Sequence, residues 1–332
     1  ADPVVPGLAL GFAFALAALV TRHLDSWTAG VRHWTLVAWF FLGLGLLLGA
    51  RWAYDVLGWG GYWGWDPVEN AGLMPWLAAT AFLHGSVMQQ ERHGFQTWNI
   101  VLAVLSFSLV LFGTFITRSG MIESVHTFAR SSLGLYFLMA IAATMIVTAA
   151  LLIARRRELN AFAAPPDRLL SRPGMFFLTI LILLSITASV WVGSLLPTFT
   201  RLLVGHSRRA DPAWFDQVTG PQFVALLLVM GICPLLARSL SSLRRPWMHA
   251  IPVIVIAAAA AGLAYAAGFT GIVPLLAFGL MGLSGGATAI EIVRGVVARS
   301  QRKNESLLRA AVAIVGHNRR RYGGFVVHLG VV

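Results

Sequence analysis

The feature that most constrains the fold of this chain is a series of apolar runs, each roughly 20 residues long, separated by short basic segments. A run of that length, wound as an α-helix, matches the hydrocarbon thickness of a bilayer. Hydrophobic residues make up 58% of the chain and charged residues only 11%, whereas soluble domains carry about 25% charged residues. We therefore predict an all-α fold, a polytopic transmembrane helical bundle.

The apolar runs predict about nine complete spans and the start of another. They lie at 4–20, 34–50, 67–90, 97–117, 133–154, 174–194, 221–240, 247–268 and 271–297, and the last begins near 322. We expect a single transmembrane domain over 1–332, because no segment has the composition of a second domain. The chain lacks a starting methionine and stops soon after the last run begins, so we expect it to be truncated at both ends.

The basic residues predict which side each loop faces. Of the 25 lysine and arginine residues, 19 lie in loops after odd-numbered spans, and such basic loops stay in the cytoplasm. The segments 51–66, 118–132 and 195–220 then face outward, and 298–321 is a basic, helical cytoplasmic connector. The net charge of +12 follows from this topology. We expect no nucleic-acid partner, because the chain has no basic domain.

One outward segment, 51–76, concentrates aromatic side chains and glycine. It contains five of the twelve tryptophans, namely Trp52, Trp59, Trp63, Trp65 and Trp76. The spacing of Trp52, Trp59 and Trp63 predicts one face of an amphipathic helix lying along the membrane surface. Two interpretations stay open: an interfacial aromatic belt, or a platform for a large planar apolar ligand.

The same segment contains a helix-start signal, Asp66-Pro67-Val68-Glu69. An aspartate at the N-cap, a proline in the first helical position and a glutamate two residues later are typical of a capped N-terminus. This pattern predicts that the third span begins at Pro67. A structural role is therefore sufficient to explain Asp66 and Glu69.

Two of the nine histidines, His84 and His328, lie deep inside predicted spans. His84 lies seven residues before Glu91, and His328 lies seven residues after Arg321, both counted from the predicted cytoplasmic boundary. At about 1.5 Å per residue, each imidazole lies about 10 Å deep. Two histidines at equal depth can bind one metal ion between two helices, and ionisable groups at such depth are usually functional. Two unrelated interhelical hydrogen bonds are the alternative.

Several motifs carry a family resemblance. The string GWGGYWGWDPVEN at 58–70, with MPWL at 74–77, resembles the tryptophan-rich WWD motif of haem-handling membrane proteins. GFAFALAALVTRHLD at 11–25, LFGTFITRSG at 111–120 and SVHTF at 124–128 are similar to the haem lyase branch of that superfamily, the cytochrome c maturation subunit CcmF. The resemblance covers most of 8–130 and returns at the final VHLG, whereas 155–320 match only in the pattern of spans.

This resemblance implies a haem lyase subunit for c-type cytochrome biogenesis. Such an enzyme takes haem from a haem chaperone and attaches it to the Cys-x-x-Cys-His thiols of apocytochrome c, together with other cytochrome c maturation subunits. It is a multi-pass protein of the bacterial inner membrane, and its substrate site faces the periplasm. A smaller WWD relative that loads or exports haem without ligating it is the alternative. A lyase dedicated to one multihaem cytochrome is another.

The resemblance also implies roles for individual residues. His84 and His328 match the axial ligands of a resident haem b, which transfers electrons to the substrate haem, with quinol as the candidate donor. His126 matches an axial ligand of the substrate haem, whose second ligand lies upstream of this chain. Arg51 and Arg118 are candidates for pairing with haem propionates, with interface anchoring as the alternative. The expected haem platform comprises Trp52, Trp59, Trp63, Trp65, Asp66 and Trp76.

Overall fold

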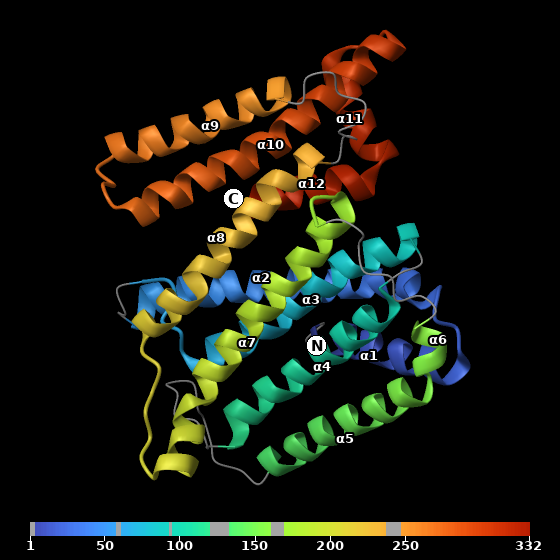
Figure 1. Cartoon of the computed structure of the whole chain (residues 1–332), viewed down its shortest axis with the longest axis vertical. Coiled ribbons are helices and arrows are strands. Elements are labelled where there is room, and N and C mark those ends of the chain that lie inside the picture. Colours follow the sequence, from blue (N-terminus) through green and yellow to red (C-terminus); the bar gives the residue numbers. More distant parts are fainter. Residues whose placement is uncertain (1–3, 58–60, 93–94, 120–132, 161–168, 237–246) are drawn as a thin grey trace. The chain divides into compact units, whose positions relative to one another are not determined.

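The computed structural model describes residues 4–57, 61–92, 95–119, 133–160, 169–236 and 247–332 (Figure 1). Within these ranges every regular element is a helix, so the all-α prediction is confirmed. The first helices are α1 (Val4–Thr21), α2 (Trp27–Trp52), the π-helical turn η1 (Ala53–Leu57), α3 (Pro67–Arg92), α4 (Gln96–Ser119), α5 (Leu133–Ala154) and α6 (Arg156–Asn160). The others are α7 (Arg172–Val204), α8 (Pro212–Leu236), α9 (Trp247–Ala266), α10 (Ile272–Lys303), α11 (Leu307–His317) and α12 (Arg319–Val331).

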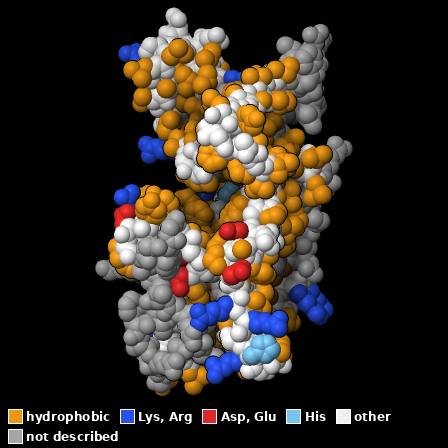
Figure 2. Space-filling model, turned by 90° about the vertical axis from the view of Figure 1, so that its left-hand side faces the viewer, with side chains coloured by type: hydrophobic (Ala, Val, Ile, Leu, Met, Phe, Trp, Pro, Cys, Tyr) orange, Lys and Arg blue, Asp and Glu red, His pale blue; other side chains and the backbone are white. Residues whose placement is uncertain are grey.

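Each predicted span corresponds to one of these helices. Among the described residues, seven helices are long and apolar enough to cross a membrane: α1, α2, α4, α5, α7, α8 and α10. Helix α9 has a shorter apolar stretch, Ala250–Ala266. Apolar side chains cover much of the face drawn in Figure 2, as expected of helices that meet lipid. The chain is therefore a multi-pass membrane protein.

Helix α3 was predicted as a span but is too polar to be recognised as one by hydropathy. It carries Glu69, Asn70, His84 and Gln89 among its 26 residues. Every side chain from 67 to 90 is buried or half-buried, and the helix packs against α2 and α4. Neighbouring helices therefore surround α3, and its polar groups find protein partners instead of lipid.

The polar end of α3 is joined to the loop between α1 and α2. The Gln89 amide nitrogen donates to the carbonyl oxygen of Leu24 at 2.8 Å, and its side-chain oxygen accepts from the Asn99 amide at 2.7 Å. Gln96 donates to the carboxylate of Asp25 at 2.8 Å. Gln89, Gln96 and Asn99 are all at most 2% exposed. These buried hydrogen bonds fix the ends of α3 and α4 against the first two helices.

Contacts divide the chain into two compact units. Unit 1 comprises Ala1–Asp167 and Phe176–Gln222, and unit 2 comprises Arg168–Met175 and Phe223–Val332. In unit 2, α9 and α10 run side by side (Figure 1). Their close approach depends on small residues, because a Cβ added to Gly282 would lie 2.7 Å from the Cβ of Ala260. The expectation of one domain over 1–332 stays a prediction.

The segments between predicted spans are more helical than expected. The predicted loop 195–220 is wrong in extent, because α7 continues to Val204 and α8 begins at Pro212. An Asp-Pro pair starts α8 as one starts α3: the Asp211 carboxylate accepts from the amide of Trp214 at 2.8 Å. The connector 298–321 is helical as predicted, and it comprises the end of α10, α11 and the start of α12.

Candidate haem site

Helix α3 begins with the capping arrangement that its sequence predicts. The Val68 amide donates to Asp66 Oδ1 at 2.9 Å. Glu69 Oε2 accepts from the amides of Asp66 at 3.1 Å and Gly64 at 3.0 Å. Both carboxylates thus bind backbone N–H groups that an uncapped helix start would leave unpaired. The structural prediction for Asp66 and Glu69 is confirmed, and the haem-contacting role of Asp66 stays a prediction.

The tryptophan-rich segment does not form one continuous helix. Arg51 and Trp52 end α2, the π-helical turn η1 follows, and residues 61–66 are not helical. Trp65 has a φ of +56°, in the left-handed region. The prediction that Trp63 shares a helix face with Trp52 is therefore wrong, because Trp63 itself is not in a helix. Trp59 lies outside the described residues.

Trp65 is held firmly by the start of α8. Its ring stacks on Phe215, with centroids 5.0 Å apart and planes 9° apart. Its Nε1 atom donates to Asp216 Oδ1 at 2.9 Å. Asn70, which is fully buried, donates to the Trp65 carbonyl at 3.1 Å and to Ser194 Oγ at 3.0 Å. One face of the Trp65 ring is therefore covered by protein, and the ring is fixed in orientation.

Trp63 lies at right angles to this fixed ring. The two ring centroids are 6.0 Å apart, with an interplanar angle of 89°. Among the described residues, the Trp63 Nε1 atom is buried and has no hydrogen-bond partner. A buried indole N–H usually has an acceptor. Trp63 therefore offers one unused donor beside an aromatic wall.

Trp76 lies at the interface of α2 and α3. Its ring stacks on Trp39, with centroids 5.3 Å apart and planes 19° apart. Gly43 makes this contact possible, because a Cβ there would lie 2.8 Å from Trp76 Nε1. Trp39 Nε1 donates to Thr80 Oγ1 at 2.7 Å, and Thr80 Oγ1 donates to the Trp76 carbonyl at 2.7 Å. Trp76 thus contributes to helix packing, and its predicted role in the haem platform stays a prediction.

His84 follows Thr80 by one helical turn, and the carbonyl oxygen of Thr80 sets its tautomer. Nδ1 of His84 lies 2.8 Å from that oxygen. A carbonyl oxygen only accepts, so the ring proton is on Nδ1 and the lone pair of the neutral ring is on Nε2. The His84 ring also lies 5.7 Å from that of Phe176 on α7. Metal-binding histidines typically have such a backbone acceptor on the nitrogen that does not bind metal.

The other predicted ligands and cation partners lie on other segments of the chain. His328 lies in unit 2, half-buried near the end of α12, and its pairing with His84 stays a prediction. Arg51 is exposed and donates to Asp55 Oδ2 at 2.7 Å. Arg118 is exposed in the last turn of α4. His126 lies outside the described residues.

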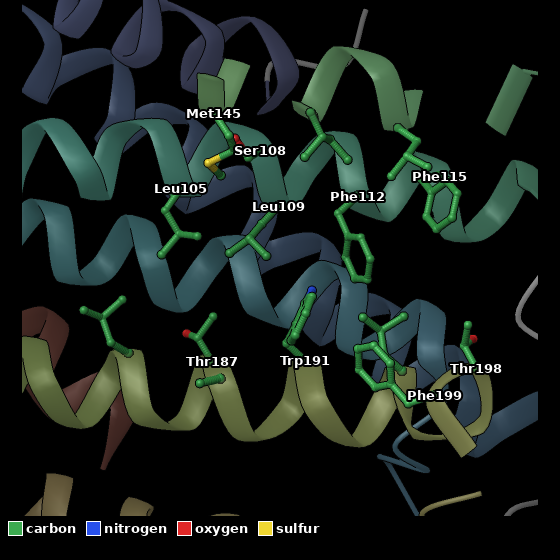
Figure 3. A pocket seen from close by; sticks show the side chains of 15 residues that line it. Leu105, Ser108, Leu109, Phe112, Phe115, Met145, Thr187, Trp191, Thr198 and Phe199 are labelled. Atoms are coloured by element: carbon green, nitrogen blue, oxygen red, sulfur yellow. The ribbon is translucent and has the colours of Figure 1, made fainter. Parts of the chain in front are cut away.

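An apolar cavity of about 760 Å³ lies elsewhere in unit 1, between α4, α5 and α7 (Figure 3). Phe112, Trp191 and Phe199 line it, and three residues add hydroxyl groups: Ser108, Thr187 and Thr198. None of the residues predicted to contact haem lies on its wall. The cavity is therefore separate from the tryptophan-rich segment and from His84.

Sequence reasoning missed the residues that position the site. The Thr80 carbonyl could have been found, because it lies four residues before His84 on the same helix. Phe215 and Asp216 have no local signal, because they meet Trp65 only through the fold.

Comparison with known proteins connects these features to a family. Residues 6–126 match the family model described as "Cytochrome C assembly protein". The biogenesis protein CycK of Bradyrhizobium diazoefficiens is 41% identical over 235 residues, covering 70% of this chain and 35% of CycK. CcmF of Haemophilus influenzae is 39% identical over 256 residues, covering 76% of this chain and 39% of the relative.

A solved structure gives the same result. The structure named "Cytochrome c Heme Lyase CcmF" aligns with a TM-score of 0.75 at 33% identity, over 99% of this chain and 48% of that chain. This chain belongs to the CcmF family. The resemblance seen in the WWD motif is thereby confirmed. The chain spans about a third of the length of its curated CcmF relatives and about half of the solved CcmF chain.

Proposed function

We propose that this chain is the haem-handling part of a cytochrome c haem lyase of the bacterial inner membrane. It receives haem from a periplasmic haem chaperone and presents it to apocytochrome c, together with other maturation subunits. The two thiols of the Cys-x-x-Cys-His motif add across the two haem vinyl groups. Each S–H supplies the sulfur and the hydrogen, so a thioether forms and nothing leaves. The protein contributes mainly by positioning the reactants.

The observation that carries this proposal is the position of the ring proton on His84, in a chain of the CcmF family. Its Nδ1 proton is directed at the Thr80 carbonyl, so Nε2 is the nitrogen that presents a lone pair. The side chains of α3, the helix that carries His84, are all buried or half-buried from 67 to 90. A neutral imidazole nitrogen of this kind is a donor that could hold haem iron. His84 and His328 are the residues that would hold a resident haem b, and such a group would supply redox chemistry to the substrate haem.

The tryptophan-rich segment is proposed as the outward platform for the substrate haem. Phe215 and Asp216 fix the orientation of Trp65, and Trp63 adds a perpendicular ring with an unused N–H donor. An interfacial aromatic belt needs neither a fixed orientation nor a buried donor. Haem has large apolar faces, which suit the fixed aromatic rings, and two propionate groups, which can accept a hydrogen bond from the unused N–H of Trp63. Trp52, Trp59, Trp76 and Asp66 complete the proposed platform.

Arg51 and Arg118 are proposed to pair with the propionates of the substrate haem. The present partner of Arg51, Asp55, forms an exposed ion pair, which contributes little to stability and is easily exchanged. His126 is proposed as one axial ligand of that haem. As electron donor we propose quinol, which is soluble in the membrane that surrounds the spans.

The experiment that tests the proposal combines a spectrum with a maturation assay. The protein is purified from membranes, and visible spectra are recorded in the oxidised and reduced states. In parallel it is expressed in a strain without its own lyase, with a c-type reporter whose covalent haem is stained. A low-spin b-type spectrum together with stained reporter supports a lyase. Haem in the protein without stained reporter would instead support the haem-loading alternative, and absence of both would refute the proposal.

A further inference from the structure

Helices α10 and α12 pack against each other in unit 2 and run in opposite directions. A Cβ added to Gly295 would collide with the hydroxyl of Tyr322, and one added to Gly285 would lie 3.4 Å from Val332 Cγ1. The contacting residues are equally far apart on the two helices and follow in opposite order, so the same pairing continues between them. His328 of α12 therefore lies at the level of residues 288–291 of α10.

Three side chains share one face of α12. Arg321, Phe325 and His328 are separated by four and then three residues, which places them in a row along an α-helix. The guanidinium carbon of Arg321 lies 5.6 Å from the centre of the Phe325 ring, so the side chain extends along the helix in the direction of His328. Arg321 and His328 are two helical turns apart, roughly 10 Å.

Arg321 shares its acidic partner with a second arginine. The Glu291 side chain is 5% exposed, and its carboxylate accepts from Arg321 at 3.3 Å. Arg294 lies 3.9 Å from the same carboxylate. Two guanidinium groups and one carboxylate leave one positive charge. The Arg321 side chain is half exposed, so an anion on this face of α12 can reach it and is attracted to it.

The face of α10 that meets α12 also carries two hydroxyl groups. Ser284 and Thr288 precede Glu291 at helical spacing, on the same face of α10. Ser284 is fully buried and Thr288 is 1% exposed, and neither hydroxyl has a hydrogen-bond partner among the described residues. Buried hydroxyl groups normally have one. This face is therefore suited to a ligand with polar groups, at the level of His328.

We propose that Arg321 binds a propionate of the haem that His328 holds, an inference that rests on the resident haem of the proposed function. A propionate extends from the edge of the porphyrin, and its carboxylate lies about as far from the iron as Arg321 lies from His328, two turns of helix. Guanidinium and carboxylate groups pair through two parallel hydrogen bonds. Glu291 keeps the Arg321 side chain beside α10, and Arg294 offsets the charge of Glu291.

The test is a redox titration of the b-type haem in the purified protein. A propionate that loses its cation favours ferric iron, because negative charge stabilises the more positive oxidation state. Arg321→Gln is expected to lower the midpoint potential by about 59 mV, a tenfold change in the ratio of oxidised to reduced haem for a one-electron couple. Arg321→Lys keeps the charge and should restore most of the wild-type potential. Arg319→Gln is the matched control, since it removes an exposed guanidinium from the opposite face of α12, and it should leave the potential unchanged.

Glu291→Gln separates this role from a structural ion pair. Removing the carboxylate leaves the Arg321 charge to the propionate, so the potential should rise. If Arg321 and Glu291 only join α12 to α10, both variants will shift the potential in the same direction, and the proposal is overturned. Equal potentials in wild type and Arg321→Gln would also overturn it, with the resident haem still in place. Wild-type protein that carries no b-type haem would refute the resident haem itself and this inference with it.

Discussion

The Nδ1 atom of His84 lies 2.8 Å from the carbonyl oxygen of Thr80, four residues earlier on the same helix. This contact decides which ring nitrogen can bind a metal. It belongs to a backbone group, so no side-chain substitution at Thr80 removes it. The Thr80 hydroxyl has a different role: it links Trp39 of α2 to the Trp76 carbonyl of α3. Thr80 therefore orients His84 through its carbonyl oxygen and joins α2 to α3 through its hydroxyl. A side-chain substitution at Thr80 changes only the second of these roles.

Replacing His84 by alanine is expected to abolish the b-type haem spectrum, because it removes the proposed axial nitrogen. Visible spectra of the purified protein, normalised to protein, measure the effect. His206→Ala is the matched control, since His206 is exposed near the loop between α7 and α8. A full Soret band in His84→Ala would remove this residue from the ligand set.

Thr80→Val is expected to leave haem content unchanged and to lower stability by about 1 kcal/mol, the typical contribution of one internal hydrogen bond. Trp39→Phe keeps an aromatic ring at this position and loses the same hydrogen bond. The two losses should be less than additive in the double variant, because both remove one interaction. Thermal unfolding in detergent measures this, and strict additivity would argue against the link.

Asp66→Ala is expected to destabilise the start of α3 by about 1 kcal/mol, whereas Asp66→Asn should be nearly neutral, because asparagine also caps helices. The measurement is the melting temperature in detergent. If Asp66 also contacts haem through its charge, Asp66→Asn will lower reporter maturation while the melting temperature stays the same. Equal maturation in Asp66→Asn and wild type would leave the cap as the role of this residue.

Asp216→Ala is expected to lower reporter maturation without changing the resident haem spectrum. It removes the acceptor of the Trp65 indole and so loosens a ring of the proposed platform. Asp211→Asn is the control, since Asp211 caps the same helix and asparagine preserves that cap. If maturation is equal in the Asp216 variant and the control, the orientation of Trp65 does not matter for the reaction.

His126→Ala is expected to keep the b-type spectrum and to abolish covalent haem attachment to the reporter. The physical reason is that the proposed substrate ligand and the proposed resident ligands are different histidines. Haem staining of the reporter measures the result, with His206→Ala again as the control. Normal reporter yield in His126→Ala would exclude this histidine from the reaction.

Features that depend on neighbouring residues are predictable from this sequence, whereas contacts between distant segments are not. The apolar run length predicts the helices, and Asp66-Pro67 predicts where α3 begins, because helix formation and capping depend on residues within one or two turns. The extent of α7 and α8 was underestimated, although Asp211-Pro212 carries the same cap signal. The prediction of one helix through Trp52 and Trp63 is wrong, because the spacing of tryptophans alone does not show where a helix ends.

The sequence by itself determined the class of this protein, its helical segments and the presence of histidine within them, since these follow from local composition and periodicity. Only the tertiary structure decided that α3 is surrounded by protein and that Trp65 stacks on Phe215 and bonds to Asp216. Those partners lie about 150 residues apart in the chain. No local period encodes such a pairing, because it arises from the packing of helices whose neighbours are chosen by shape and by the need to pair buried polar groups.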